Sequence, residues 1–511
     1  MTEKCPLFDD GPRESCGIAA VYSKNIPAMP IAADAQRALD NRGQQAYGAA
    51  TRMGETVREP VRKKGEVGRG YTDDEFNHLG GQMAIVHNRY STRPDDGEDM
   101  ENTQPLYSRD SHCAIGHNGN IPTGCYSKLR KEIEKSGYKF ETTSDTEVLL
   151  YLLASCVDIV SGFREISTKV RGSWSVVVLN NDGIYAARDP QGIKPLCLGR
   201  RDGVTIVASE SSAFYPIGAE LERSIVPGEI LHITPDGSEE STFLQQGPFA
   251  LDIFEIIYFA NPHSVIDGIC VSDARFFSGR LMARHDRDEG FRFGEKGAIA
   301  VPYPNSGIYF TEGYAYELGI PVVSGLYRSR THRSFIQGNN ELRKRVATRK
   351  VVPIHSMLEN QICVVGDDSL VRGVTAMGKM GEIRSHHPKE LHLRLNFPPI
   401  THPCDLGIDM KTSDEHFAFQ VPDIGERERK IGVDSLRYLP FEDLFAAIAM
   451  ARRQEKPYGK YADEMKKTPL SFCTHCFSGI HPFSQEFPDY AKTIQFPILF
   501  EKPAYNPFDK F

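Results

Sequence analysis

The sequence predicts two folded units of different class, an α+β unit with antiparallel sheets and then an α/β unit with a parallel sheet. Between residues 174 and 241, three Asp-Gly pairs stand between apolar or β-branched runs, in WSVVVLNNDGIYAARD, LCLGRRDGVTIVASE and EILHITPDGSEES. Asp-Gly supplies the positive φ of tight hairpin turns, so these segments predict antiparallel strands. The later runs GAIAVPYPNSG, GIPVVSG and QICVVGDDS end in small or acidic residues and alternate with helical patterns, which is typical of parallel α/β units.

Helix signals complete both units. In TTSDTEVLLYLLASC, Ser144 and Glu147 form a capping-box pattern, and an apolar stripe follows over residues 148–153. The segment FEDLFAAIAMARR predicts an amphipathic helix before a tail rich in Cys, Pro and aromatic residues. We therefore expect two antiparallel sheets covered by helices at 16–245, a parallel-sheet domain at 246–430 and a C-terminal helical, Cys-containing tail at 431–511.

Composition excludes several classes of function. The chain has 511 residues and a net charge of -8, which argues against a general nucleic-acid partner because such proteins present a basic face. No apolar run reaches the length of a membrane span, and the first residues, MTEKCPLFDD, lack the apolar core of a secretory signal. The 11 cysteines in so long a chain do not indicate a disulfide framework. We expect a cytoplasmic protein with no membrane partner.

Four short segments of the N-terminal half carry residues suited to amide chemistry. Cys16 alone would most simply be a buried thiol, since free cysteines usually are. In VHNRYST, Arg89 offers a fixed fork for a carboxylate. In GHNGN, the Asn118 amide and the backbone N–H of Gly119 can hold a developing oxyanion. Asp145 stands at a helix start, where its carboxylate can hold a substrate ammonium group.

These segments resemble the N-terminal-nucleophile, class II glutamine amidotransferases. In that family a mature N-terminal Cys-Gly is followed by Arg-Gly-Gln, Arg-Tyr-Ser-Thr, His-Asn-Gly-Asn and Ser-Asp. The same patterns stand in the same order at residues 16–17, 42–44, 89–92, 117–120 and 144–145. Each pattern alone is weak, but five in order are specific. The resemblance implies a four-layer αββα Ntn-hydrolase domain.

The resemblance also implies roles for these residues. Residues 1–15 look like a propeptide whose removal would free the α-amino group of Cys16 to act as a base toward its thiol. Cys16 would attack the glutamine side-chain amide, and Asn118 and Gly119 would stabilise the oxyanion. Arg89 and Asp145 would bind the α-carboxylate and α-ammonium of glutamine. Arg42 is included among the glutamine-site residues, with a supporting role through packing and hydrogen bonding.

The segment QICVVGDDSLVRGVTAMGK carries the chemistry of the second unit. A buried strand leads to Asp367 and Asp368, followed by a Ser/Gly/Thr loop and a helix. Two carboxylates can bind the hydroxyls of a ribose, and backbone N–H groups at a helix start can cradle a phosphate. For an isolated Asp-Asp pair, a βα turn with solvated acids would be the simpler interpretation.

The whole stretch, however, resembles the Asp-Asp-Ser-Ile-Val-Arg-Gly-Thr-Thr motif of type I phosphoribosyltransferases. The resemblance implies that Asp367 and Asp368 hold the ribose hydroxyls. The residues of its 5-phosphate loop would be Ser369, Arg372, Gly373 and Thr375. Val374 stands where the family commonly has Thr, which removes one hydroxyl contact.

A glutaminase followed by this motif resembles the amidophosphoribosyltransferase family over residues 14–480, including RDPQGIKPLCLG, FEIIYFANPHS and PPITHPCDLGIDM. The resemblance implies conversion of glutamine and phosphoribosyl diphosphate to 5-phosphoribosylamine, glutamate and pyrophosphate, the first step of purine synthesis. Ammonia would pass through an internal channel. Mg²⁺ would be held by Asp367, Asp368 and Ser306. A homo-oligomer, either dimer or tetramer, and feedback by purine nucleotides are implied as well.

Two segments depart from the family pattern near the pyrophosphate. Val-Pro-Asp-Ser-Gly reads VPYPNSG at residues 301–307, with two residues added and Asn305 at the place of the acid. The mobile loop reads RSRTHRSFI, one residue shorter and without its glycine. The basic residues that can still meet the diphosphate are Arg328, Arg330, Arg333 and Lys350. These departures keep open a non-enzymatic sensor that binds phosphoribosyl compounds without normal turnover.

Three C-terminal cysteines suggest a metal site. One subset of the family ligates a 4Fe–4S cluster with cysteines at the places of Cys404, Cys473 and Cys476. The fourth ligand of that subset corresponds to Asp252, and Cys270 is a further candidate. A zinc site that includes His402 or His475 suits the Cys-x-x-Cys spacing as well, and reduced, packed thiols without metal are the third interpretation.

Other synthases share the glutaminase domain. Glucosamine-6-phosphate synthase and asparagine synthetase would be the alternatives for the acceptor half. The Asp-Asp-Ser motif at residues 367–369 disfavours both.

Overall fold

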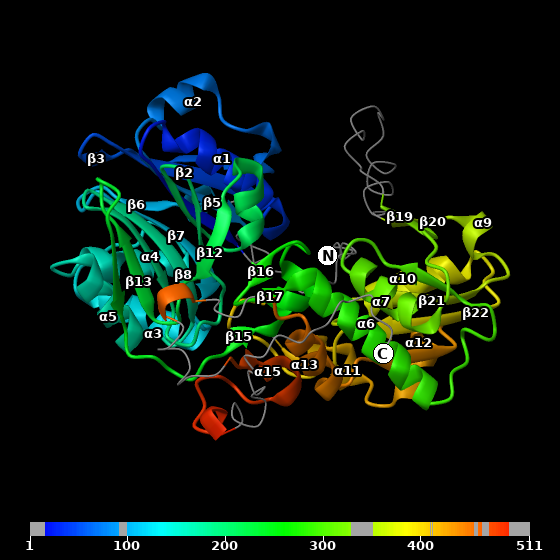
Figure 1. The fold of residues 1–511 in the computed structure, drawn as a ribbon. Helices are drawn as coiled ribbons and strands as arrows, with labels where there is room; N and C mark the ends of the chain where they lie inside the picture. The colour runs from blue at the N-terminus through cyan, green and yellow to red at the C-terminus, as the bar shows by residue number, and fades with distance from the viewer. Residues whose placement is uncertain are drawn as a thin grey trace, which may run out of the picture.

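The structure is a computed structural model that describes residues 16–90, 100–328, 351–408, 410, 412–453, 458–461 and 470–489. Residues 1–15, Arg330, Arg333 and Lys350, and the side chains of Val374 and Thr375, lie outside the described part, so the predictions made for them stay predictions. Figure 1 shows two lobes, the N-terminal half in blue to green and the second half in green to orange.

Two antiparallel sheets form the N-terminal lobe. The first has the order β12-β10-β11-β1-β5-β2-β3, with β4 paired to β2, and the second has the order β14-β13-β9-β8-β7-β6. The strands of the first sheet are β1 (Gly17–Ser23), β2 (Ala46–Met53), β3 (Thr56–Val57), β4 (Val61–Lys64), β5 (Met83–Arg89), β10 (Cys197–Arg201), β11 (Val204–Ala208) and β12 (Glu220–Ser224). Those of the second are β6 (Leu106–Ser108), β7 (Cys113–Asn120), β8 (Ser173–Asn180), β9 (Gly183–Arg188), β13 (Glu229–Ile233) and β14 (Glu239–Phe243).

Helices cover the outer faces of both sheets, which confirms the predicted αββα layers (Figure 1). One apolar cluster, including Ile18 and Val177, fills the space between the sheets. A second cluster packs α1 (Ala28–Ala38) on the first sheet. A third packs α3 (Thr123–Lys135), α4 (Asp145–Ala154) and α5 (Ile159–Lys169) on the second. The short α2 (Asp73–His78) and the 3₁₀ turns η1 (Asp40–Arg42) and η4 (Ser211–Ile217) lie on the first sheet's side.

The three predicted Asp-Gly hairpins are confirmed. They join β8 to β9, β10 to β11 and β13 to β14, and Gly203 and Gly237 adopt φ of 70° and 87°. The helix start at Ser144 is confirmed, but the capping box is not. The Ser144 hydroxyl accepts from the N–H of Thr146, whereas the Glu147 carboxylate accepts from the N–H groups of Glu141 and Thr142. Glu147 is therefore used to fix the preceding loop.

A connecting segment leads to the second lobe. It contains β15 (Leu251–Asp252), the π-helical turn η5 (Glu255–Phe259), the hairpin of β16 (Val265–Ile266) with β17 (Ile269–Cys270), and the long helix α6 (Val271–Asp288). From the C-terminal tail, β24 (Phe472–Cys473) pairs with β15 in parallel and α15 (His475–Ser478) follows. The tail is thus tied to the segment that joins the two lobes.

The second lobe contains the predicted parallel sheet, in the order β18-β21-β22-β23. Its strands are β18 (Ile299–Pro302), β21 (Ile362–Asp367), β22 (Glu390–Leu395) and β23 (Ser435–Tyr438), and the antiparallel pair β19 (Leu326–Arg328) and β20 (Val351–Pro353) lies beside it. The run GIPVVSG contributes only a parallel bridge between Val322 and Ala300. Because β23 belongs to the sheet, the predicted domain end at residue 430 is wrong.

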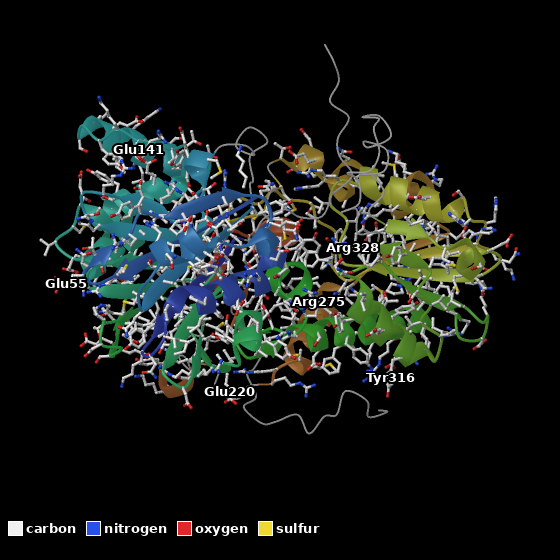
Figure 2. All side chains as sticks on the ribbon, turned by 90° about the horizontal axis from the view of Figure 1, so that it is seen from above. Glu55, Glu141, Glu220, Arg275, Tyr316 and Arg328 are labelled. Atoms are coloured by element: carbon white, nitrogen blue, oxygen red, sulfur yellow. The ribbon has the colours of Figure 1, made fainter. Side chains whose placement is uncertain are left out.

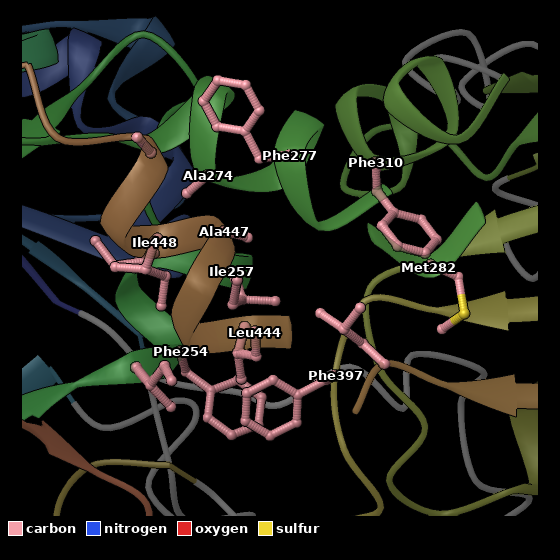
Figure 3. Close-up of a cluster of buried hydrophobic side chains, with 14 of the residues drawn as sticks. Phe254, Ile257, Ala274, Phe277, Met282, Phe310, Phe397, Leu444, Ala447 and Ile448 are labelled. Carbon is pink, nitrogen blue, oxygen red and sulfur yellow. The ribbon is translucent and has the colours of Figure 1, made fainter. Parts of the chain in front are cut away.

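The second lobe's helices are α7 (Ile308–Leu318), α9 (His355–Leu358), α10 (Val374–Arg384), α11 (Phe417–Gln420), α12 (Ile424–Ile431) and α13 (Phe441–Met450). Figure 3 shows Phe254 and Ile257 of the connecting segment packed with Phe277 of α6 and with Leu444 and Ile448 of α13. Each such fully buried side chain contributes about 1.5–3 kcal/mol. In the described residues, no helix is long and apolar enough to cross a lipid bilayer.

Candidate active site

Cys16 lies at the start of the central strand β1 of the first sheet. β1 pairs with β5 on one side and β11 on the other, so the backbone that follows the thiol is held on both edges. Cys16 is partly exposed, and its Sγ lies 3.9 Å from the carbonyl oxygen of Tyr90. The thiol is therefore accessible while its backbone is fixed, as a nucleophile requires.

Asn118 and Gly119 lie on β7 of the second sheet. The amide of Asn118 is buried, and neither its oxygen nor its nitrogen has a partner among the described residues. A buried amide without partners is destabilising unless a ligand uses it. Gly119 has φ 150°, and an added Cβ would lie 2.1 Å from the carbonyl oxygen of Ser173. Only glycine fits there, and the pair matches the predicted oxyanion site.

An inter-sheet hydrogen bond connects the strand that carries Arg89 to the strand that carries Asn118. His87 of β5 contacts the carbonyl oxygen of His117 on β7 through Nε2, at 3.2 Å. Arg89 lies two residues after His87 and is buried, and Asn118 follows His117. Burial lowers the pKa of His87 to about 3, which keeps this link neutral.

Asp145 lies at the first position of α4, where the helix dipole stabilises a carboxylate. Its Oδ2 accepts from the N–H of Ile121 at 2.8 Å, and its Oδ1 lies 3.9 Å from Nδ1 of His117. Burial lowers the pKa of His117, so Asp145 has a neutral neighbour there. The neutral imidazole therefore does not compete with an ammonium group for this carboxylate.

Arg42 does not have the position of a glutamine ligand. Its guanidinium is fully buried and donates to Glu210 Oε1 at 2.7 Å and to Glu255. Glu255 belongs to η5 of the connecting segment, so the contact joins the two lobes. Arg42 therefore does not bind the carboxylate of a ligand in this arrangement, because both carboxylates that surround it belong to the protein. Its role is the supporting one.

One cavity of about 710 Å³ lies between the lobes. From the second lobe it is lined by Asp367, Asp368, Ser369, Arg372, Gly373, Ser306 and Arg328. From the first lobe it is lined by Asp40, Asn41, Gly43, Gln44 and Tyr90. Figure 2 shows Arg275, which also lines it, and Arg328 at the junction of the lobes. The carbonyl oxygen of Tyr90 therefore contacts the Cys16 thiol, and Tyr90 also forms part of the wall of this cavity between the lobes.

The two predicted ribose-binding acids have different surroundings. Asp367 ends β21, accepts from the N–H of Asp368 at 2.9 Å, and has Nζ of Lys379 3.3 Å from its Oδ2. Asp368 accepts from the Ser369 hydroxyl at 2.7 Å. Burial and then the charge of Asp367 raise the pKa of Asp368 to about 7. Hydroxyl donors or a cation at this pair would relieve that repulsion.

The loop after the acids leads into α10, as predicted. Gly373 precedes the helix with φ 72°, and a Cβ there would lie 2.5 Å from the Phe417 ring. The backbone N–H groups at this helix start can bind a phosphate. Arg372 lines the cavity but pairs with Glu415 at 2.9 Å, so a phosphate would compete with that carboxylate.

Sequence reasoning missed several residues of the cavity. Arg275 of α6 donates to the carbonyl oxygens of Ile256 and Ala260, and burial lowers its pKa to about 10. Lys379 and Tyr303 also line the cavity. Lys379 stands six residues into α10, one helical turn beyond Thr375 on the same side, a spacing that could have indicated it. No sequence signal marks Arg275.

The three cysteines of the predicted cluster lie in one region. Burial raises the pKa values of Cys473 and Cys476 far above the usual range, and the nearby Cys404 and Asp252 add to the effect. Asp252 pairs with Cys473 in the β15–β24 register, but its Oδ2 is bound by Nζ of Lys194 at 2.7 Å. Across the described ranges, no three His, Cys, Asp or Glu side chains are arranged to hold a metal ion. Asp252 therefore does not fit as the fourth ligand, and the cluster stays a prediction.

Comparisons with known proteins agree with this architecture. Residues 87–216 match the glutamine amidotransferase domain. The chain is 37% identical over 481 residues to the amidophosphoribosyltransferase of Methanothermobacter thermautotrophicus, covering 92% of this chain and 95% of that one. It is 34% identical to amidophosphoribosyltransferase 1, chloroplastic, of Arabidopsis thaliana, covering 93% and 80%.

A solved structure matches this chain over nearly its whole length. The glutamine phosphoribosylpyrophosphate amidotransferase of B. subtilis, complexed with ADP and GMP, superposes with a TM-score of 0.78 at 30% identity, covering 91% of this chain and 97% of that one. The match therefore spans both lobes and nearly the whole of that relative. The chain belongs to the amidophosphoribosyltransferase family.

Proposed function

We propose that this chain hydrolyses glutamine at Cys16 and transfers the ammonia to phosphoribosyl diphosphate, giving 5-phosphoribosylamine, glutamate and pyrophosphate. This is the first step of purine synthesis. One observation carries the proposal: Tyr90 contacts the Cys16 thiol and also lines the cavity that contains the Asp367–Asp368 pair. The nucleophile of the glutaminase half and the cavity of the transferase half therefore both contact Tyr90.

In the glutaminase half, Cys16 Sγ attacks the side-chain amide carbon of glutamine, ammonia leaves, and water then hydrolyses the resulting thioester, which releases glutamate and restores the thiol. Asn118 and the N–H of Gly119 hold the oxyanion, and the amide of Asn118 is free for this because no described residue uses it. Arg89 binds the α-carboxylate and Asp145 the α-ammonium. With residues 1–15 removed, the α-amino group of Cys16 takes the thiol proton and passes it to the leaving ammonia.

In the transferase half, the ammonia enters the cavity past Tyr90. Asp367 and Asp368 accept from the ribose hydroxyls, and the start of α10 binds the 5-phosphate. Asp367, Asp368 and Ser306 would hold Mg²⁺, because they offer the hard oxygen ligands that this ion prefers. A bound Mg²⁺ would offset the negative charge of the diphosphate.

The predicted 4Fe–4S cluster would be held by Cys404, Cys473 and Cys476 and would cross-link the tail to the connecting segment. Asp252 would complete the set only if its carboxylate left Lys194. Iron and sulfide content of protein purified without oxygen tests this, with Cys473→Ser as the comparison. Equal and negligible iron in both proteins would exclude the cluster.

Further ligands follow from the family. Purine nucleotides are proposed as feedback ligands, since the B. subtilis relative was solved with ADP and GMP. A homo-oligomer, dimer or tetramer, is proposed as well, and light scattering of the purified protein tests it. A sensor without turnover is not favoured, because the similar curated chains carry the name of the enzyme.

Cys16→Ala tests the proposed function. We expect glutamine-dependent formation of phosphoribosylamine to be lost while the reaction with added ammonia is kept. Cys125→Ala is the matched control, because Cys125 is a half-buried thiol on α3 outside the site. Glutamine-dependent turnover in Cys16→Ala would refute the nucleophile, and wild type without pyrophosphate release from either nitrogen source would refute the transferase.

A further inference from the structure

Lys379 is a partly buried cation that lines the cavity and that the proposed mechanism does not use. It lies on α10, and its Nζ is 3.3 Å from Oδ2 of Asp367. The same ammonium group lies 3.8 Å from the centre of the Tyr303 ring. Both Lys379 and Tyr303 line the cavity. An ammonium group held between a carboxylate and an aromatic face is positioned by two independent contacts.

These contacts leave Lys379 with unused donors. An ammonium group has three N–H donors, and Asp367 is its one hydrogen-bond partner among the described residues. The distance of 3.3 Å exceeds the 2.7–2.9 Å, roughly, of an optimal charge-assisted bond. The Lys379 side chain is 27% exposed toward the cavity. The pair is therefore looser than a structural ion pair and open to a second, anionic partner.

Tyr303 places this cation next to the segment that differs most from the family. Residues 301–307 carry two added residues, and Tyr303 is one of the residues in this lengthened segment. Its backbone is fixed, because its N–H donates to the carbonyl oxygen of Gly366 at 2.9 Å and its carbonyl oxygen accepts from Gly307 at 3.0 Å. Asn305, at the place of the family acid, also lines the cavity. The lengthened loop thus presents an aromatic face and removes a negative charge.

We propose that Lys379 binds the diphosphate of phosphoribosyl diphosphate, with Tyr303 as the positioning residue that holds its ammonium group. The inference rests on the proposed function and adds a substrate contact to it. Lys379 lies between the acids that bind the ribose hydroxyls and the loop of residues 303–306. The family resemblance puts the segment 301–307 near the diphosphate, and Lys379 contacts Tyr303 of this segment.

The chemistry requires a cation at this position. The lone pair of ammonia forms the C1–N bond while the C1–O bond breaks, and the electron pair of that bond stays on the diphosphate oxygen. The proton that the new ammonium group must lose passes to solvent. The Lys379 ammonium offsets the charge that collects on the leaving diphosphate.

Inhibition by two probes in the ammonia-dependent reaction tests the proposal. Inorganic pyrophosphate carries the diphosphate alone, and ribose 5-phosphate carries the sugar without it. Lys379→Met is expected to raise the inhibition constant of pyrophosphate about 10-fold or more, because it removes a charged hydrogen bond, and to change that of ribose 5-phosphate less than about 2-fold. Lys379→Arg should restore most of the pyrophosphate binding, and Tyr303→Ala should weaken it more than Tyr303→Phe.

The matched control is Lys389→Met, which removes an exposed lysine of the same lobe. An unchanged pyrophosphate constant in Lys379→Met would overturn the proposal, and so would equal weakening of both probes, which indicates general damage to the cavity. If the wild-type chain released no pyrophosphate from phosphoribosyl diphosphate, the proposed function would fail. Calorimetric titration of pyrophosphate into wild type and Lys379→Met would then still decide the role of Lys379.

Discussion

Arg42→Met should weaken the whole molecule from a site far from solvent. Arg42 is fully buried and pairs with Glu210 of the first lobe and Glu255 of the connecting segment. Glu255 in turn lies 3.6 Å from Nζ of Lys194, which also binds Asp252 at 2.7 Å. Methionine fills a similar volume without charge, so the variant leaves two buried carboxylates without their main cation.

The structure sets the expected magnitude. Removing one partner of a buried ion pair costs about 3–5 kcal/mol. Glu210 would keep Asn41, the Ser264 hydroxyl and the N–H of Asn261 as donors. Because these donors compensate in part, we expect the low end, about 3 kcal/mol. For a domain of the size of the N-terminal lobe, a loss of each kcal/mol in the free energy of unfolding lowers Tm by about 2–4 °C. The Tm of Arg42→Met should therefore fall by about 6–12 °C.

Differential scanning calorimetry of the full chain measures this change. Arg37→Met is the matched control, because Arg37 pairs with Asp34 at the surface, with side chains 44% and 50% exposed. Such a pair contributes about 0–1 kcal/mol, so its loss should lower Tm little. Arg42→Lys should lower Tm by less than Arg42→Met does, since lysine keeps the charge but cannot donate to both carboxylates as the guanidinium does. A Tm of Arg42→Met no lower than that of Arg37→Met would refute the reasoning.

Three further predictions concern the two half-reactions and stability. Gly119→Ala should lower glutamine-dependent turnover about 100-fold or more, because its Cβ would lie 2.1 Å from the carbonyl oxygen of Ser173. Ammonia-dependent turnover should be unchanged, and steady-state kinetics with each nitrogen source measure both effects. Burial lowers the pKa of His87 to about 3, so the folded state excludes a proton that the unfolded chain binds below about pH 6.5. The free energy of unfolding should therefore fall as pH drops from 6.5 toward 3, by up to about 1.4 kcal/mol per unit, and urea unfolding of His87→Gln at pH 5 and 7 should show a flatter response. The pKa of Asp368 is raised to about 7, so kcat/KM for phosphoribosyl diphosphate should rise with pH through 7 in the wild type. In Asp368→Asn the value should be low and independent of pH. The pH profile of the ammonia-dependent reaction measures this.

The sequence predicted those features that local rules determine. Asp-Gly turns fix hairpins because glycine accepts positive φ, and all three hairpins were found. The αββα layers followed from five ordered motifs, and the roles that these motifs imply for Cys16, Asn118 and Asp145 stay predictions. The buried, unpartnered amide of Asn118 agrees with its assigned role. The capping box predicted from Ser144 and Glu147 is the exception among the local features, because Glu147 binds the N–H groups of the preceding loop.

The features that sequence reasoning missed depend on contacts between distant segments. Arg42 was expected to support the glutamine site through packing and hydrogen bonding, but its partner Glu255, 213 residues away, could not be identified from the sequence. Lys379 carries no motif, and its environment exists only once β21 and the loop with Tyr303 come together. The partners of charged side chains are set by tertiary packing. The hydrophobic period and the spacing of motifs along the sequence do not encode them.

The short turn η1 connects the buried charges between the lobes to the wall of the cavity. One residue of it, Arg42, is anchored in the buried charges that join the lobes, while the adjoining Gly43 and Gln44 form part of the cavity wall. Gly43 packs so closely on the strand end that a Cβ would lie 2.6 Å from the carbonyl carbon of Arg89. The same strand end leads to Tyr90, whose carbonyl oxygen contacts Cys16. A ligand in this cavity would therefore lie against the same stretch of backbone that contacts Cys16 and carries Arg89.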